Sequence, residues 1–222
     1  LPPGRSAFLW GPRKSGKTHW IHHQFAPAGA TILDLLETDT FAEYAARPSL
    51  LRERWKGALT IIDEIQKAPQ LLEVVHSLME EKKGLQFILT GSSARKLRKA
   101  GVNLLAGRAL MKHMHPFLAA ELKGRFKLDK ALQRGMIPVV LDSPDPGAAL
   151  HAYVDLYIRE EVQMEGFTRN IGNFTRFLET VSYSHGSILN ISNVARECQV
   201  ERKVVEGYIG ILEDLLLAYR VP

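Results

Sequence analysis

The chain is poor in cysteine and has no long apolar segment. Cys198 is the only cysteine among 222 residues, which excludes a framework of intrachain disulfides and favours a reducing compartment such as the cytoplasm. Apolar runs such as residues 137–141 and 215–219 are far shorter than the roughly 20 residues that cross a bilayer, so no membrane partner is expected. The first residues lack the apolar core of a secretory signal, and because residue 1 is not methionine we expect a trimmed chain.

The excess of positive charge is confined to one stretch of the sequence. The whole chain has a net charge of +5. Residues 95–134 hold 11 basic and 2 acidic side chains, whereas residues 135–165 hold one basic and six acidic side chains. Aromatic side chains that stack on bases are scarce in the basic stretch. A solvated or internally paired face is therefore the favoured interpretation, and a nucleic-acid surface is the alternative.

The first half of the chain alternates short apolar runs with helical patterns, which is typical of a parallel α/β sheet. Five runs are predicted as strands: residues 7–10, 31–36, 59–62, 85–90 and 109–115. An amphipathic helix is predicted over residues 71–79, with Pro69 in its first turn and Gly84 after its end. After Pro116 the pattern is mostly helical, interrupted by Pro138, Pro144 and Pro146.

The last part of the chain is predicted to hold three helices and a terminal apolar run. Two of these helices, residues 192–198 and 201–212, are separated by a turn at residues 199–200. This spacing is a helix-turn-helix pattern. Direct DNA binding is not favoured, because residues 188–222 hold four basic and five acidic side chains. A role in protein interaction or as a nucleotide lid is the alternative.

Residues 11–18 read Gly-Pro-Arg-Lys-Ser-Gly-Lys-Thr and match the pattern G-x-x-x-x-G-K-[ST] at every fixed position. The pattern follows a predicted strand and opens a helix, so backbone N–H groups and the helix dipole converge on a polyphosphate. Lys17 is predicted to reach the β and γ phosphates of ATP, and the Thr18 hydroxyl to ligate Mg²⁺. The predicted phosphate-binding residues are Gly11, Pro12, Arg13, Lys14, Ser15, Gly16, Lys17 and Thr18.

Two acids stand at the carboxyl end of the third predicted strand. Asp63 is predicted to hold Mg²⁺, and Glu64 to orient or deprotonate the attacking water. Acids at such a place also cap helices, but the phosphate loop about 45 residues upstream favours catalysis. A small-molecule kinase is disfavoured, because Glu64 beside Asp63 suits activation of water better than positioning of an acceptor.

Hydroxyl groups and one arginine complete the predicted site. Thr90 and Ser92, at the end of the fourth strand, are candidates to polarise the water or sense the γ phosphate. The alternative for Ser92 and Ser93 is a cap on a helix that starts near residue 94. Arg108, before the fifth strand, is predicted to supply positive charge to a γ phosphate, in a neighbouring copy if the protein oligomerises. The alternative is an ordinary surface arginine.

Four segments resemble those of a group of prokaryotic AAA-type P-loop ATPases. They are Asp63-Glu64-Ile65-Gln66-Lys67-Ala68-Pro69, Leu89-Thr90-Gly91-Ser92-Ser93, Leu105-Ala106-Gly107-Arg108, and His115-Pro116-Phe117-Leu118 with Glu121. The resemblance implies an α/β P-loop NTPase fold with a three-layer parallel sheet, followed by a helical lid and a winged-helix-like helix-turn-helix module. The expected segments are an ATPase core over residues 1–116, a lid over 117–165 and the module over 166–222.

The resemblance also implies binding of ATP with Mg²⁺, and its hydrolysis to drive a conformational change. The expected partners are ATP, other copies of the chain and an unknown protein client. Members of the group carry a further C-terminal domain of unknown function, which we expect to be absent here. Arg159 is the candidate second-sensor arginine. Two other functions stay open. One is a nucleotide-dependent regulatory switch with slow turnover, and the other is a DNA-associated module in which ATP controls binding through the basic stretch of residues 95–134.

Overall fold

The computed structural model describes residues 5–55, 57–81, 84–92, 97, 105, 108–158 and 171–221, with the side chains of 156–158 left out. It divides into two compact units. The first comprises Leu1–Phe126 and Met136–Pro138, and the second Lys127–Gly135 and Val139–Pro222. The boundary expected at residue 165 lies outside the described residues, so the division into three segments stays a prediction. Within the described ranges, no helix is long and apolar enough to cross a membrane.

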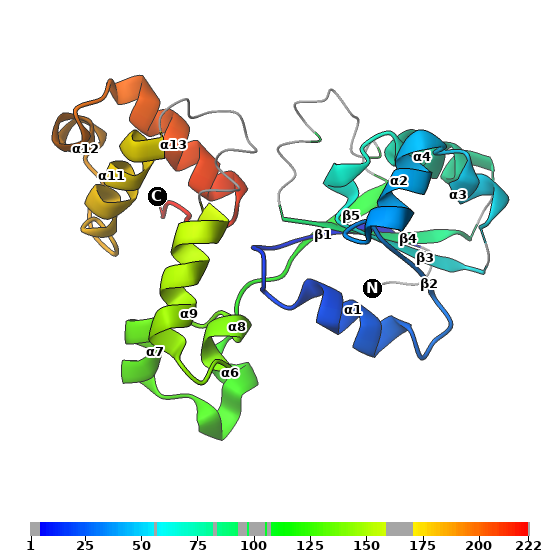
Figure 1. Ribbon diagram of the computed structural model, residues 1–222, viewed down its shortest axis with the longest axis horizontal. Coiled ribbons are helices and arrows are strands. Elements are labelled where there is room, and N and C mark those ends of the chain that lie inside the picture. The colour runs from blue at the N-terminus through cyan, green and yellow to red at the C-terminus, as the bar shows by residue number, and fades with distance from the viewer. Residues whose placement is uncertain are drawn as a thin grey trace. The chain divides into compact units, whose positions relative to one another are not determined.

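The first unit is built on a five-stranded parallel sheet (Figure 1). Its strands are β1 (Ser6–Trp10), β2 (Thr31–Asp34), β3 (Leu59–Asp63), β4 (Gln86–Gly91) and β5 (Ala109–His113). The five predicted strands are therefore confirmed, with ends that differ by one or two residues. The strand order is β2-β3-β4-β1-β5, and every neighbouring pair is parallel. All carboxyl ends consequently lie at one edge of the sheet, and β4 separates β1 from β3.

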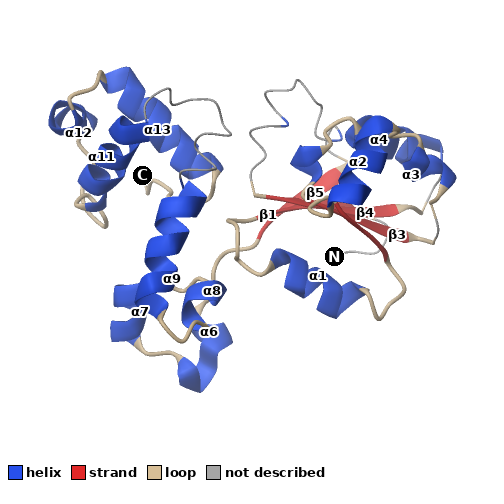
Figure 2. Cartoon of the chain, viewed as in Figure 1, coloured by secondary structure: helices blue, strands red, loops and turns tan. Residues whose placement is uncertain are grey.

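Helices cover both faces of this sheet, as Figure 2 shows. One face carries α1 (Lys17–Phe25), and the other carries α2 (Thr38–Ala46), α3 (Leu50–Glu53) and α4 (Leu71–Glu81). Ile21 of α1 packs with Ile61 of β3 and Ile88 of β4. On the opposite face, the Ser6 hydroxyl of β1 contacts the Met79 sulfur of α4 at 3.7 Å. The predicted three-layer arrangement is confirmed, because helices lie against both faces of the sheet.

The apolar stripe of α4 explains its place on the sheet. Leu71, Leu72, Val75 and Leu78 are all buried, as their helical spacing predicts. Pro69, predicted in the first turn of this helix, lies in the turn just before it, between the 3₁₀ helix η1 (Ile65–Lys67) and the first residue of α4.

The helices between residues 119 and 158 are short. They are α6 (Ala119–Leu122), η3 (Lys123–Arg125), α7 (Leu128–Arg134), α8 (Pro138–Leu141), α9 (Pro146–Ala152) and the π-helix η4 (Tyr153–Ile158). Pro138 and Pro146 interrupt the helical pattern as predicted, because each begins a new helix after the preceding one has ended. The first turn of a helix tolerates proline because the N–H that proline lacks has no intrahelical acceptor there. Asp145 caps α9 by accepting from the Ala148 N–H at 3.0 Å.

Three helices at the end of the chain share one apolar core in the second unit. They are α11 (Ile171–Ser182), α12 (Ile191–Cys198) and α13 (Arg202–Asp214). Tyr208 of α13 meets the rings of Phe174 and Phe177 of α11 at centroid distances of 5.0 and 5.2 Å. The two helices of the predicted helix-turn-helix are thus confirmed, with Gln199 at φ 55° in their turn. Residues 171–221 hold no strand, so a wing stays a prediction.

Candidate functional site

The loop after β1 has the backbone shape of an anion cradle. Gly16, the residue before α1, has φ 97°, a conformation that glycine adopts without strain and other residues rarely adopt. No side chain caps the first turn of α1, and that turn holds no acidic residue. The N–H groups of a first helical turn have no intrahelical acceptors, so they attract an anion together with the helix dipole.

Lys17 places a positive charge inside this loop. The residue is 5% exposed, and its ammonium group donates to the carbonyl oxygens of Gly11 at 2.7 Å and Pro12 at 3.0 Å. A buried charge is tolerated only when hydrogen bonds replace its lost hydration. The loop therefore holds the ammonium group at the amino end of α1, beside the N–H groups.

Ser15 adds a hydrogen-bond donor that fits an anionic ligand. Its hydroxyl is buried and has no hydrogen-bond partner within the described part of the chain. A buried polar atom without a partner destabilises the fold. A phosphate oxygen in the loop would supply the missing acceptor, so the residues present fit a polyphosphate.

Asp63 connects the phosphate loop to the neighbouring strands. It is 1% exposed, and one carboxylate oxygen, Oδ2, accepts from the Thr18 hydroxyl at 2.6 Å. The other oxygen, Oδ1, accepts from the Thr90 hydroxyl at the end of β4. The structure thus brings together three predicted site residues that are far apart in the sequence. It does so because β1, β4 and β3 are consecutive in a parallel sheet.

These oxygen atoms suit Mg²⁺. Proteins hold this ion through one or two carboxylates together with substrate phosphates and water, and seldom in an all-protein cage. Asp63 with the Thr18 hydroxyl meets that requirement. No cluster of three His, Cys, Asp or Glu side chains that could hold a metal ion occurs among the residues described.

Glu64 is a buried carboxyl group on an unusual backbone. It has φ 61° and ψ 46°, a left-handed conformation that costs a non-glycine residue about 1–3 kcal/mol. It is 6% exposed, and burial raises the pKa of its carboxyl group, against the opposing effect of the Lys17 charge. Its N–H donates to the Thr90 hydroxyl at 3.2 Å. A carboxyl group with a raised pKa is suited to accept a proton during a reaction.

Gln66 belongs to the site, although sequence reasoning assigned it no role. Its side-chain nitrogen donates to the Glu64 carboxylate and to the Ser92 hydroxyl, the latter at 3.3 Å. The sequence feature that could have identified Gln66 is its position two residues after Glu64, within the motif of residues 63–69. Ser92 is buried at the end of β4 and faces this amide, whereas Ser93 and Arg159 lie outside the described residues.

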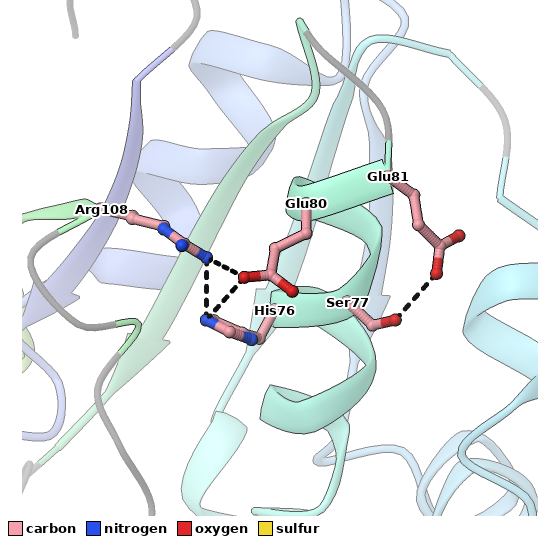
Figure 3. Close-up of polar contacts among 5 residues, drawn as sticks. All are labelled: His76, Ser77, Glu80, Glu81 and Arg108. Carbon is pink, nitrogen blue, oxygen red and sulfur yellow. Dashed lines mark hydrogen bonds and ion pairs between the residues drawn. The ribbon is translucent and has the colours of Figure 1, made fainter.

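Arg108 lies at the opposite edge of the sheet from the phosphate loop. It precedes β5, whose first residue pairs with Ser6 at the start of β1, whereas the loop follows the end of β1. A five-residue strand spans about 16 Å. The Arg108 guanidinium donates to Glu80 of α4 at 2.8 Å and contacts His76 at 2.9 Å (Figure 3). Within one chain Arg108 therefore does not join Lys17, and only the role in a neighbouring copy stays a prediction.

The ion pair between Arg108 and Glu80 is exposed. The hydrogen bond from Arg108 lowers the pKa of the Glu80 carboxyl group, and the nearby His76 acts in the same direction. Exposed pairs of this kind contribute little to stability because water and salt screen them. Arg108 can consequently leave Glu80 for another anion at small cost.

Comparisons with known proteins agree with the motifs. Residues 4–123 match the family described as AAA domain, and residues 125–222 match the Domain of unknown function (DUF8612). No curated protein matches the chain.

Two solved structures show a weak likeness. One is the Holliday junction branch migration motor RuvB of Thermotoga maritima, with 14% identity, a TM-score of 0.41, and coverage of 98% of this chain and 82% of that one. The other is the replication initiator DnaA bound to AMPPCP and single-stranded DNA, with 12% identity, a TM-score of 0.43, and coverage of 96% and 83%. At these TM-scores neither likeness bears on function.

The AAA domain match covers more than half of the chain and includes the predicted site residues from Gly11 to Arg108, whereas Arg159 falls within the second match. The second match begins two residues after the first ends and includes α7 to α13. The chain therefore belongs to the AAA domain family of P-loop ATPases. It continues into a domain of unknown function over residues 125–222, where the lid and the helix-turn-helix module were expected.

Proposed function

We propose that the protein binds ATP together with Mg²⁺, hydrolyses it between the β and γ phosphates, and uses turnover to change conformation. The observation that carries this proposal is the hydrogen bond of 2.6 Å from the Thr18 hydroxyl to the Asp63 carboxylate. It joins the helix that follows the phosphate loop to the strand that carries the acids. These are the two parts that phosphoryl transfer from a nucleotide requires.

Each side chain has a distinct task in the proposed reaction. The N–H groups of the loop and the Lys17 ammonium group bind the phosphates, while Thr18 and Asp63 would hold the metal. Bound Mg²⁺ neutralises negative charge on the phosphate oxygens. Glu64 accepts a proton from the attacking water, and Thr90 fixes both acids through the Asp63 carboxylate and the Glu64 N–H.

Phosphate release from ATP by the purified chain tests the proposal. We expect release with MgCl₂, its loss when EDTA removes the metal, and its return when MgCl₂ is restored. Isothermal titration calorimetry measures ATP binding in the same samples. A chain that neither binds nor hydrolyses ATP contradicts the proposal. Binding with almost no hydrolysis would favour the alternative of a slow nucleotide switch.

We propose further that Arg108 acts on the nucleotide of a neighbouring copy. Specific activity is then expected to rise with protein concentration, and Arg108→Ala to lower kcat at least about tenfold, since arginines supplied in trans contribute strongly to phosphoryl transfer. Arg52→Ala is the matched control. It removes an exposed arginine that is paired with Glu81, which like Glu80 lies on α4, and it is expected to leave kcat unchanged.

Mixing two inactive variants separates action in trans from a structural effect. Lys17→Ala copies retain Arg108, and Arg108→Ala copies retain the phosphate loop. A mixture is expected to regain part of the wild-type activity if Arg108 acts across an interface. Activity independent of concentration, with no gain on mixing and no oligomer by light scattering, would refute the role in trans.

The alternative of a DNA-associated module has less support. On α13 the Arg202 side chain donates to Glu206 at 3.0 Å, and Arg220, which follows this helix, donates to Glu213 of α13 at 2.7 Å. Nonspecific binding depends on basic groups that neutralise DNA phosphates, and these two arginines already have acidic partners. ATPase assays with and without duplex DNA across a salt series test this alternative. Stimulation by DNA that falls steeply with salt would favour it.

A further inference from the structure

We propose that Gln66 is a positioning residue for hydrolysis. Its side-chain amide connects the Glu64 carboxylate to the Ser92 hydroxyl and holds the carboxylate in the orientation that receives a proton from the attacking water. This inference rests on the proposed function of the site, and it adds a residue that acts on the hydrolytic step and not on ATP binding.

The contacts of Gln66 define its orientation. The residue lies in η1, which begins directly after Glu64, and its Nε2 group donates both to a Glu64 carboxylate oxygen and to the Ser92 hydroxyl. An ionised carboxylate only accepts hydrogen bonds, so the nitrogen is the amide atom that must face Glu64. One side chain thereby links the carboxyl ends of β3 and β4.

The backbone of β4 leaves room for this amide only because residue 91 is glycine. A Cβ atom at Gly91 would collide with the Gln66 side-chain oxygen and would lie 2.6 Å from Cζ3 of the Trp10 ring. Both contacts would be closer than an ordinary van der Waals contact. Gly91 therefore allows Gln66 to lie against β4 within reach of Ser92.

Two energetically unfavourable features occur in this bridge. Glu64 has a left-handed backbone, and the Gln66 Oε1 atom is buried with no hydrogen-bond partner within the described ranges. Strained backbone and unpaired buried polar atoms concentrate at functional sites, where the surrounding structure maintains them. A bridge with a purely structural task would have no need of either feature beside a buried carboxylate.

The competing explanation is that Gln66 only ties β3 to β4, and kinetics of matched variants distinguish the two. Gln66→Met keeps the length of the side chain and removes its hydrogen bonds, and Gln66→Ala removes both. We expect kcat to fall about tenfold to 100-fold in each, because small displacements of a catalytic group have effects of this size. The ATP dissociation constant is expected to stay within about twofold of wild type, since neither contact involves the phosphate loop.

The control variant lies in the same segment. Gln70 also donates through its side-chain amide, to the Ala45 carbonyl at 3.3 Å, and it lies outside the site. Gln70→Met is expected to leave kcat unchanged. In a Glu64→Gln background, Gln66→Met is expected to have no further effect on kcat, because Gln66 acts through Glu64.

A nuclear magnetic resonance measurement on the nucleotide-free protein tests the bridge without turnover. The side-chain ¹H–¹⁵N signals of Gln66 are identified by their loss in Gln66→Met. They are expected to move in Ser92→Ala and in Glu64→Gln, and to remain in place in Gln70→Met. Signals that respond to neither partner would overturn the inference, whether or not the protein hydrolyses ATP.

The outcomes separate this inference from the proposed function. If the wild-type chain hydrolyses ATP while both Gln66 variants keep its kcat, the inference fails and the proposed function stands. An additive loss in the Glu64→Gln background would also overturn it. If the wild-type chain neither binds nor hydrolyses ATP, the proposed function fails and the role of Gln66 fails with it.

Discussion

Lys17→Ala is expected to abolish ATP binding, with the affinity weakened at least about 100-fold. The ammonium group lies within the loop, 2.7 Å from the Gly11 carbonyl and 3.0 Å from the Pro12 carbonyl, and is predicted to contact two phosphate groups. A hydrogen bond to a charged group contributes about 1.5–3 kcal/mol, and 1.4 kcal/mol corresponds to a tenfold change in affinity. Two such contacts therefore account for a loss of this size.

Calorimetric titration of ATP into the variant measures this loss. Lys112→Ala is a suitable control, because it removes an equal charge from an exposed position on the edge strand β5 and is expected to leave the affinity unchanged. Circular dichroism distinguishes lost binding from lost folding. A folded Lys17→Ala protein with wild-type affinity would show that the loop does not bind the phosphates of ATP.

The phosphate loop could be predicted from the sequence because its residues are contiguous. Eight consecutive positions contain the pattern, and a strand before it and a helix after it specify the geometry. The convergence of Asp63 and Thr90 could also be predicted. Both lie at the carboxyl ends of their strands, β3 and β4, and parallel strands end at the same edge of the sheet.

The bridge made by Gln66 could not be predicted in this way. It depends on β4 lying directly beside β3, on the left-handed backbone of Glu64, and on the absence of a side chain at Gly91. The order of strands in a sheet is a property of tertiary packing, and local patterns do not specify it. Glutamine also lacks an ionisable group, and it was their carboxylates that made Asp63 and Glu64 candidates for metal binding and catalysis.

The position of Arg108 could be predicted by the same rule of parallel strands. The sequence places Arg108 directly before the fifth strand, and the direction of that strand then decides at which edge of the sheet it lies. Because β5 runs parallel to β1, the residue before β5 lies at the amino edge of the sheet, away from the loop. The motif around Arg108 predicts a functional residue, and the direction of the strand means that action on a nucleotide would require a neighbouring copy.

Glu64→Gln is expected to lower kcat about 100-fold to 1,000-fold while ATP binding is retained. A positioned general base contributes a factor of this order, and glutamine cannot take the proton. The amide has nearly the same shape as the carboxyl group, so the packing around Thr90 and Gln66 is maintained. Phosphate release at saturating ATP and calorimetric binding separate the two effects.

The same variant is expected to be more stable than the wild-type chain at neutral pH. Burial raises the pKa of Glu64 in the folded protein, so the stability that this group contributes is greatest below its unfolded value near 4.5 and is lost as the pH rises through the folded value. Glutamine does not titrate. The gain in Tm should therefore be absent at low pH and grow toward pH 7. It should amount to about 2–4 °C for each kcal/mol gained in the free energy of unfolding.

Loss of activity together with a gain in stability distinguishes a functional carboxylate from a structural one. Replacing a structural carboxylate would lower both activity and stability. A catalytic group in a buried, strained position destabilises the folded protein, so its replacement should lower activity and raise stability. Glu73→Gln is the control, because it changes an exposed acid on α4 and should alter neither property. Wild-type turnover in Glu64→Gln would exclude Glu64 as the base. If the difference in Tm between Glu64→Gln and the wild-type chain stayed the same from low pH to pH 7, the carboxylate would not be buried in solution.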